Sequence, residues 1–541
     1  MKKVPYGKTD FKNLIESNSI YVDKTMYLEK LEDTADTIIY LRPRRFGKTL
    51  FTSMMYYYYD INSKDLYDDL FKDTYIYNNP TKNKNNYYIL KIDFSGMSSN
   101  NGTIENIEKK FKNRIIEGIN KFMSYYDNYI KINEDNNSAD ILSFFLSSIK
   151  LDHKIYVIID EYDNFTNSLL DSNNIDIFQG ILGKNGFVKD FYARIKEYSG
   201  SVIDRCFITG VCSISLDSMT SGFNIATNIT NEYDFNSMTA LEKWEIKNII
   251  KDIPDSDYHL NTMIEYYDGY CFSEGIKEKV FNPTLTMYYL KYLFEKGASP
   301  QRLLDSNIIS NYEQIKNIVS LGDYKEILDD IFDNGEIVSN LSVNFNLNKK
   351  FSRSNIISLL YYFGYLTIKE GYISGYRFII PNRVMKTIYG DYYLAILNDD
   401  LIKTYDEREF DIIDEIINNG KLDKLCDYIS YLLENMDNRI FINYKEKDLQ
   451  IMIYTILIRY LILDVYLEYP IGNDFIDMVI FTKNYNYIIE LKYIKKKDKK
   501  DYKKIHNEAK KEISKYTLDV ENKKKFIIIF TGSNYTLEEV V

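Results

Sequence analysis

Two groups of residues in the chain have types and spacings that suit chemistry on phosphate. The first is Gly47-Lys48-Thr49, which ends the stretch YLRPRRFGKTL like a phosphate-binding loop. In such a loop the backbone N–H groups bind phosphate, Lys48 would reach the β and γ oxygens, and the Thr49 hydroxyl would hold Mg²⁺. The usual pattern starts with glycine, whereas this chain has Arg42 there. The motif alone therefore predicts a nucleotide site only weakly.

An acidic pair strengthens the interpretation. The apolar run KIYVIIDEYDN predicts a strand that ends in Asp160-Glu161. An acidic residue at such a strand end can hold the Mg²⁺ shell, and the next carboxylate can polarise the attacking water. A third run, RCFITGV, ends in Thr209, where a polar side chain can contact the γ-phosphate or the water. The simpler alternatives are a solvated acidic pair and a threonine that only shapes a turn.

Two arginines in the loop have an open role. Arg44 and Arg45 either cradle phosphate or make surface contacts, and the sequence favours neither. The elements around the loop fit a nucleotide site, because DTIIYLRP predicts a buried strand and GKTLFTSMMYYYY a helix. A further strand, YYILKIDFSG, widens the expected parallel sheet.

The second group of residues lies near the C-terminus, in DVYLEYPIGNDFIDMVIFTKNYNYIIELKYIKKK. The pattern predicts three strands, with Asp477 in the middle one and Glu490 and Lys492 on one face of the last. Two carboxylates and a lysine on one sheet face can bind Mg²⁺ and orient a water for attack on a phosphodiester. The alternative is a salt-bridged sheet surface.

A helix before these strands adds a further carboxylate. KEKDLQIMIYTILIRYLI places Glu446 and Gln450 on one face, so Glu446 could join the metal ligands. The alternative is that both residues belong to a solvated first turn. After the strands, residues 491–517 carry eleven Lys against four acidic residues, a local charge of +7. This suits a nucleic-acid backbone, although a solvated Lys-rich helix has the same composition.

The middle of the chain predicts a connection between the two groups. NIISLLYYFGYLTIKEGYISGYRFIIPNRVM reads as a helix and two strands, which is typical of a winged helix. Such modules bind DNA or serve as rigid connectors, and we favour the connector because no dense basic stripe is present. We expect domains at 1–290, 291–404 and 405–541.

The motifs of the first third resemble the AAA-ATPase-like family. PYGKTDFKNLIESNSIYVDKT, LRPRRFGKT, VIIDEYDN, FITGV, YYDGYCF and FNPTLTMYYL occur in the family's order over about residues 1–290. The family's loop typically reads Arg-Pro-Arg-Arg-Phe-Gly-Lys-Ser/Thr, so its missing glycine is normal. The resemblance implies an ASCE-type phosphate-loop ATPase that uses ATP and Mg²⁺. It also places Lys48 and Thr49 at the nucleotide, makes Asp160 and Glu161 the acidic pair, and puts Thr209 in the sensor position.

The last third resembles the PD-(D/E)XK nuclease superfamily, over about residues 405–541. The resemblance implies a restriction-endonuclease-like α/β domain, with Asp477 and Glu490 as metal ligands and Lys492 as the water-orienting residue. Two departures from the usual pattern weaken the expected phosphate contacts. Phe475 stands where members usually have Arg, and Glu512 where they usually have Gln.

Composition limits the remaining function classes. With 541 residues, 45% of them hydrophobic, the chain can form several packed cores. A net charge of -11 confines any nucleic-acid site to a local basic patch. The cysteines and histidines match no zinc spacing, and neither an apolar leader nor a long apolar run occurs. We therefore expect a cytoplasmic protein that makes no membrane contact.

The combined prediction is an α/β protein that hydrolyses ATP and cleaves nucleic acid, with DNA the favoured partner. The alternative is a nucleotide-operated switch or scaffold whose C-terminal domain binds nucleic acid or protein without cleavage. ATP-driven translocation is disfavoured because helicase motifs are missing. Assembly into a homo-oligomer stays open.

Overall fold

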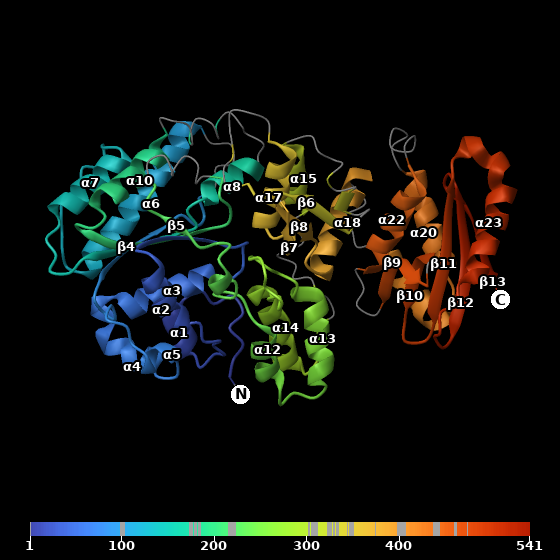
Figure 1. Ribbon diagram of the computed structural model, residues 1–541, viewed down its shortest axis with the longest axis horizontal. Coiled ribbons are helices and arrows are strands. Elements are labelled where there is room, and N and C mark those ends of the chain that lie inside the picture. Colours follow the sequence, from blue (N-terminus) through green and yellow to red (C-terminus); the bar gives the residue numbers. More distant parts are fainter. Residues whose placement is uncertain are drawn as a thin grey trace. The chain divides into compact units, whose positions relative to one another are not determined.

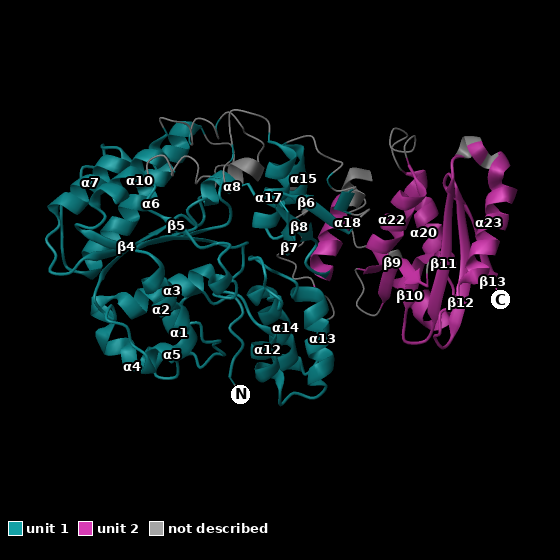
Figure 2. Cartoon of the chain, in the orientation of Figure 1, with its two compact units in different colours: residues 1–300, 313–382 teal, residues 301–312, 383–541 magenta. Residues whose placement is uncertain are grey.

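The computed structural model shows two compact units, formed by residues 1–300 with 313–382 and by residues 301–312 with 383–541 (Figure 2). The described residues are 2–97, 103–171, 177, 181, 186–214, 223–300, 303, 312–321, 327, 330–331, 335–342, 345, 351–373, 375–397, 407–435, 444–458, 463–472 and 474–540. Within these ranges, no helix has both the length and the apolar character that a bilayer crossing requires.

The first unit is built on a parallel sheet with the strand order β2-β3-β4-β1-β5. Its strands are β1 (Thr37–Leu41), β2 (Tyr88–Asp93), β3 (Ile155–Asp160), β4 (Ile203–Gly210) and β5 (Thr227–Asn228). All residues of β1 and β3 are buried, because a parallel sheet covered on both faces requires continuous apolar strands. The sequence-predicted strands of this region are thereby confirmed.

Helices cover both faces of this sheet (Figure 1). One face carries α6 (Ile104–Tyr125), α7 (Ser138–Ser148) and α10 (Phe187–Tyr198), and the other carries the helices from α1 to α5. These are α1 (Phe11–Glu16), α2 (Met26–Thr34), α3 (Lys48–Tyr59), η1 (Ile61–Leu66), α4 (Tyr67–Phe71) and α5 (Tyr75–Asn78). The core between them and the sheet is largely aromatic and includes Phe11, Tyr58, Tyr59, Phe71 and Phe207.

The unit continues through short elements that follow β3 and β4. They are α8 (Asn164–Asp171), η2 (Tyr233–Phe235), α12 (Lys243–Ile250), α13 (Ser256–Tyr267) and α14 (Pro283–Lys296). Helix α14 begins with Asn282 as its N-cap and Pro283 in its first turn, and ends at Gly297 in the left-handed region. The start of α14 lies beside the loop that precedes α3, because the Thr284 hydroxyl donates to the Arg45 carbonyl.

A winged-helix-like module completes the first unit, and we use this name for α15, α17 and β6–β8. Their bounds are α15 (Tyr312–Ser320), β6 (Glu336–Ser339), α17 (Arg353–Tyr362), β7 (Thr367–Tyr372) and β8 (Gly375–Ile379). The sequence predicted the helix α17 and two strands, and the structure adds β6 to give a three-stranded antiparallel sheet, β6-β8-β7. Tyr361 of α17 packs on Phe378 of β8 with ring centroids 5.6 Å apart.

The second unit contains a five-stranded sheet with the order β13-β12-β11-β10-β9. Its strands are β9 (Asp464–Ile471), β10 (Asp474–Phe481), β11 (Asn486–Ile494), β12 (Lys523–Thr531) and β13 (Asn534–Val540). Strands β11 and β12 pair in parallel, and the other neighbours are antiparallel. The predicted strands around Asp477 and Glu490 are confirmed as β9, β10 and β11.

Helices lie on both sides of this second sheet (Figure 1). The helices of this unit are α18 (Arg383–Leu397), α19 (Glu407–Asp414), the π-helix η5 (Glu415–Asn419), α20 (Asp423–Glu434), α22 (Glu446–Ile458), η6 (Lys496–Asp501) and α23 (Tyr502–Lys515). Helices α20 and α22 lie on one side of the sheet and α23 on the other (Figure 1). Helix α23 packs on β11 and β12 through an apolar cluster that includes Ile488, Ile513 and Ile527. The division into three domains stays a prediction. In the structure the expected connector, 291–404, is shared between the two units.

One buried acid after α13 makes stability depend on pH. Burial raises the pKa of Asp268 from 3.8 to about 6. The folded state therefore binds this proton more tightly than the unfolded chain, so Asp268 lowers stability as pH rises from about 4 to about 6. Asp268→Asn keeps an acceptor for the Gly269 N–H. We expect it to raise Tm by about 1–3 °C at pH 7.5 and not at pH 4 in thermal melts, and the exposed Asp257→Asn to change neither.

Candidate functional site

The loop between β1 and α3 ends in Gly47, at a position where the backbone conformation and the close surroundings favour glycine. Gly47 is the N-cap of α3 and has a φ of 74°, and an added Cβ would lie 3.0 Å from the Thr239 carbonyl oxygen. Arg45 also has a positive φ, 69°. This backbone brings the first turn of α3, with its free N–H groups, to the carboxyl edge of the sheet, which is the position of a phosphate-binding loop.

Arg42 replaces the usual first glycine with a buried side chain. It is 1% exposed, and its guanidinium donates to the carbonyls of Leu41 at 2.8 Å, Thr230 at 2.7 Å and Phe235 at 2.8 Å. The Arg42 side chain therefore holds the loop in place by binding backbone carbonyls that follow β5. The conformational freedom of a glycine is not needed at this position.

Lys48 lies inside the loop. Its ammonium donates to the carbonyls of Arg42 at 2.8 Å and Pro43 at 2.9 Å. Burial lowers the pKa of Lys48 to about 8, against the opposing effect of nearby carboxylates, of which Glu161 is the strongest. A phosphate oxygen that replaced these two carbonyls would give the ammonium a full negative charge as its partner, which is a stronger interaction.

Asp160 at the end of β3 is fixed by two hydroxyls. The Thr209 hydroxyl donates to one carboxylate oxygen at 2.6 Å, and the Thr52 hydroxyl donates to the other at 3.2 Å. Asp160 and Thr209 are each 1% exposed. Thr209 thus orients this carboxylate, and its expected contact with the γ-phosphate or the water stays a prediction. Thr52 went unnoticed in the sequence, although it lies three residues after Thr49 on α3.

A second buried carboxylate, which sequence reasoning missed, fixes the end of β4. Asp163 accepts from the N–H of Val211 at 3.0 Å and of Cys212 at 2.7 Å. Gly210 is required beside it, because a Cβ there would lie 2.3 Å from the Tyr162 ring. The strand ends that carry Asp160 and Thr209 are therefore locked together.

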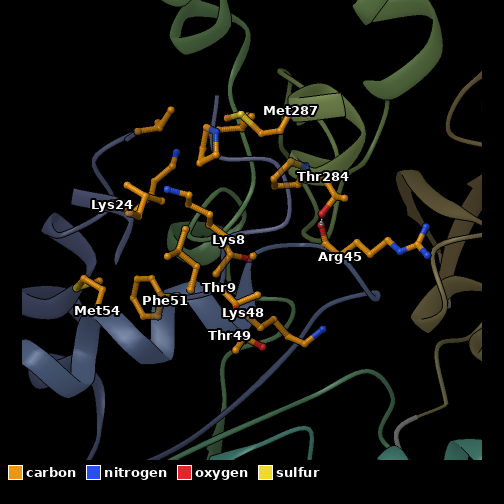
Figure 3. Close-up of a pocket in the computed structure, with 18 of the residues that line it drawn as sticks. Lys8, Thr9, Lys24, Arg45, Lys48, Thr49, Phe51, Met54, Thr284 and Met287 are labelled. Carbon is orange, nitrogen blue, oxygen red and sulfur yellow. Dashed lines mark hydrogen bonds between the residues drawn. The ribbon is translucent and has the colours of Figure 1, made fainter. Parts of the chain in front are cut away.

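A cavity of about 320 Å³ opens beside the loop. Arg45, Gly47, Lys48, Thr49 and Glu161 all line it, and Figure 3 shows Lys48 and Thr49 on one side of it. Burial raises the pKa of Glu161, whose φ of 53° lies in the left-handed region. Of the sequence-predicted residues, Arg44 is exposed and lines no part of the cavity, and Asp160 and Thr209 lie outside its lining.

The other wall of the cavity comes from segments to which the sequence assigned no role. It is apolar and includes Pro5, Ile20, Tyr21, Val22, Leu241 and Met287. Two lysines, Lys8 and Lys24, also line it, and the Lys24 ammonium pairs with Glu245 of α12 at 2.6 Å. The family-typical stretch from residue 5 to 25 was the available signal. The cavity thus has one polar end and one apolar end, as a nucleotide requires.

In the second unit the structure brings the predicted acidic residues around one ammonium. The Nζ atom of Lys492 lies 2.7 Å from Glu490, 3.4 Å from Asp477, 3.4 Å from Glu446 and 3.7 Å from Glu512. Burial lowers the pKa of Lys492, but the carboxylates, Asp477 first among them, more than offset this and raise it. The predicted juxtaposition of Asp477, Glu490 and Lys492, with Glu446 beside them, is therefore present.

Backbone and side-chain donors orient two of these carboxylates. Asp477 accepts from the Leu491 N–H at 2.8 Å, and Glu490 accepts from the Tyr516 hydroxyl at 2.8 Å. Burial raises the pKa of both, that of Glu490 to about 8, and a hydrogen bond with Glu512 contributes to the second shift. Sequence reasoning missed Tyr516 and treated Glu512 only as a departure.

The edge strand β9 adds a further acidic residue, Glu468, at a position where its backbone is irregular. Glu468 of β9 has a φ of 47° at the point where the strand passes Asp477, and the Asp477 charge contributes to the raised pKa of Glu468, after burial. The pairing of β9 with β10 keeps one register on both sides of Glu468, so the left-handed residue interrupts the ladder locally without a bulge. Phe475 of β10 pairs with Pro470 of β9 and is 56% exposed, and its side chain lacks the charge with which an Arg would bind phosphate.

The acidic cluster around Lys492 offers the kind of ligand atoms that a hard cation prefers. Its ligands are all oxygens, as Mg²⁺ prefers, and it already surrounds a positive charge. Within the described ranges, no three acidic, His or Cys side chains are grouped closely enough to hold a metal ion in this arrangement. A divalent ion would therefore share the carboxylates with the Lys492 ammonium or displace it.

Comparisons with known proteins show similarities over two parts of the chain. Two solved structures are similar to 68% of this chain: the Walker-type ATPase of Pyrococcus abyssi (12% identity, 94% of that chain, TM-score 0.37) and Cdc6p from Pyrobaculum aerophilum (10% identity, 93% of that chain, TM-score 0.27). No curated protein matches the chain. Residues 5–220 match the family model described as predicted AAA-ATPase, and residues 444–540 match that of the PD-(D/E)XK nuclease superfamily. Both resemblances are therefore confirmed, each over its own part of the chain.

Proposed function

We propose that the first unit binds and hydrolyses ATP with Mg²⁺ and that the second unit is a metal-dependent nuclease, with DNA as the favoured substrate, in the cytoplasm. The observation that carries the first half is the convergence of Lys48, Thr49 and Glu161 on one cavity beside the oriented carboxylate of Asp160. Assembly into a homo-oligomer is compatible with this function and is open to measurement.

Each residue of the ATP site has a defined task in this proposal. Lys48 binds the β and γ oxygens, Thr49 and Asp160 hold Mg²⁺, and Glu161 polarises the attacking water. Thr209 and Thr52 keep the Asp160 carboxylate in one orientation. The apolar wall, with Tyr21, receives the base.

Lys48→Met is expected to weaken ATP binding on the order of 100-fold, because it removes the ammonium that would bind the phosphate oxygens while keeping a buried side chain of similar length. Titration with a fluorescent ATP analogue measures the effect. Lys154→Met is the matched control, since Lys154 pairs with Asp204 in front of β3 and lines no part of the cavity. Equal affinities for both variants would contradict the role of Lys48.

The nuclease half rests on the acidic cluster and its surroundings. Asp477 and Glu490, with Glu446, would hold Mg²⁺, which when bound lowers the pKa of a water and neutralises phosphodiester charge. Lys492 would orient that water or stabilise the charge that develops on phosphate. The basic stretch of residues 491–517 supports a polyanionic partner beside the cluster.

A second function is favoured by specific features of the same site. Glu512 adds a carboxylate to the Lys492 contacts, and Phe475 is exposed where a cation would serve phosphate better. Both features suit a domain that binds nucleic acid or protein without cutting, under control of the nucleotide state of the first unit.

A cleavage panel separates the two functions. Linear, circular and single-stranded DNA and RNA are incubated with Mg²⁺ or Mn²⁺, with and without ATP. Metal-dependent cleavage of any substrate supports the nuclease, and a change in rate with ATP supports coupling between the activities. Retained ATP hydrolysis without cleavage would favour the switch, and Phe475→Arg would then be the first variant to assay for recovered cleavage.

A further inference from the structure

The phosphate-binding loop is contacted by a segment that lies far along the chain. The Phe46 ring meets Tyr270 and Phe272 edge to face, with centroids 4.9 and 5.3 Å apart. The guanidinium carbon of Arg42 lies 4.2 Å from the centroid of the same Phe272 ring and 4.4 Å from the centroid of the Tyr40 ring. These are favourable aromatic and cation–π arrangements in a buried setting. The loop and the segment 270–272 therefore form one packed group.

A turn of the winged-helix-like module touches the loop directly. Gly364 lies between α17 and β7 with a φ of 83°, and a Cβ there would be 2.9 Å from Cβ of Pro43 and 3.6 Å from the Tyr270 ring. Any other residue at position 364 would therefore push against the loop. Glycine lets the module approach to contact distance.

Hydrogen bonds tie the segment 270–272 to the module as well. The Asn231 amide donates both to the Phe272 carbonyl and to the Tyr361 hydroxyl, at 2.7 Å each. The Cys271 N–H donates to the Thr367 hydroxyl at 2.7 Å. Two physical connections thus run from the loop to α17 and β7, one through Pro43 and one through Arg42 and Phe272.

The two loop residues that make these connections are the same two whose carbonyls accept the Lys48 ammonium. A phosphate that engages Lys48 takes away the donor of both carbonyls, so the loop segment of Arg42 and Pro43 must readjust. We propose that the winged-helix-like module senses occupancy of the nucleotide site through the contact of Pro43 with Gly364 and the stack of Arg42 on Phe272. This inference rests on the proposed nucleotide binding and makes Gly364 a positioning residue that acts through Pro43.

Reciprocity follows from the thermodynamics of linked sites. If nucleotide binding shifts the module, any partner or substitution that shifts the module changes nucleotide affinity by the same factor. The second unit resumes at Arg383, shortly after the end of β8 at Ile379.

The first test needs no variant. Amides of the turn from Phe363 to Leu366 are hydrogen-bonded to carbonyls of residues 359–361, so hydrogen exchange of a peptide covering 359–368 reports on its stability. We expect addition of ATP and Mg²⁺ to the full chain to change the exchange rate of this peptide at least twofold. Nucleotide binding without any exchange change at residues 359–368 would overturn the inference and leave the proposed ATP site intact. Absence of nucleotide binding would overturn both.

The second test isolates the contact from backbone strain. Gly364→Ala is expected to change the affinity for a fluorescent ATP analogue about tenfold. Gly275→Ala and Gly200→Ala are matched controls, because their φ values of 78° and 81° impose the same strain while no atom lies within 4 Å of the new Cβ. Their affinities should stay within about twofold of the wild-type value.

A double variant distinguishes sensing from a general structural defect. Pro43→Gly removes the Cβ and Cγ atoms that a new Cβ at 364 would strike, so the pair Pro43→Gly/Gly364→Ala should recover the affinity of Pro43→Gly alone to within about twofold. No recovery, or a Gly364→Ala affinity equal to that of the controls, would overturn the inference. Should Gly364→Ala fail to fold, Tyr361→Phe removes only the hydroxyl that accepts from Asn231, and its affinity should shift about threefold.

Discussion

Arg42→Gly, which restores the glycine of the usual phosphate-binding pattern, is expected to destabilise the first unit by about 3–5 kcal/mol. The guanidinium is almost fully buried and satisfies three backbone carbonyls, so its removal leaves buried acceptors without donors and opens a cavity between two rings. Glycine also adds freedom to a loop that the arginine holds in place. The substitution that looks most conservative by pattern is thus among the most damaging by structure.

Urea unfolding followed by tryptophan fluorescence measures this loss. The single tryptophan, Trp244, lies in α12 of the first unit and reports on that unit. Arg44→Gly is the control, since Arg44 is exposed two residues further along the same loop, and it should change stability by less than about 0.5 kcal/mol. Equal midpoints and slopes for both variants would show that the Arg42 contacts contribute little.

Asp477→Asn is expected to lower the rate of DNA cleavage on the order of 1,000-fold while leaving ATP hydrolysis unchanged. The amide has the shape of the carboxylate and can still accept from the Leu491 N–H, so the strand pairing is preserved. It lacks the charge that a divalent cation requires of its ligand.

Single-turnover cleavage with Mg²⁺ provides the measurement. Asp474→Asn on the same strand is the matched control, because Asp474 is exposed and has no contact with Lys492 in the described structure. Comparable rates for Asp477→Asn and Asp474→Asn would remove Asp477 from the metal site. A loss of ATP hydrolysis in Asp477→Asn would instead reveal a dependence of the first unit on the second.

Strands β1–β4 and β9–β11 were predicted because their apolar runs are local features, whereas β5, β12 and β13 of the same sheets were not predicted. The positions of Lys48, Asp160 and Glu161 followed, since each comes directly after a strand or loop that the pattern identifies. The hydrogen-bond partners of Arg42 and Thr209 did not follow. A buried arginine is recognised only by its acceptors, and the Thr230 carbonyl lies 188 residues away. Thr209 and Thr52 choose Asp160 as partner because of side-chain geometry that no spacing encodes.

The acidic cluster shows the same limit. Strand alternation placed Glu490 and Lys492 on one face, and helical spacing made Glu446 a candidate. The approach of Glu512 and Tyr516 depends on how α23 packs on the sheet, which involves apolar contacts of Ala509 and Ile513. The backbone irregularity at Glu468 consists of a single left-handed residue that is not glycine, so no composition rule indicated it.

The interior position of β1 between β4 and β5 has a consequence for synthesis of the protein. Arg42 leaves the ribosome long before the Thr230 carbonyl that it binds, and at typical translation rates the 188 residues between them take about 10–40 s to make. Until β4 has emerged, β1 has no sheet neighbour on either side, and an apolar strand of this kind is prone to aggregate. The nucleotide loop is completed later still, after the segment that contains Thr230 has emerged.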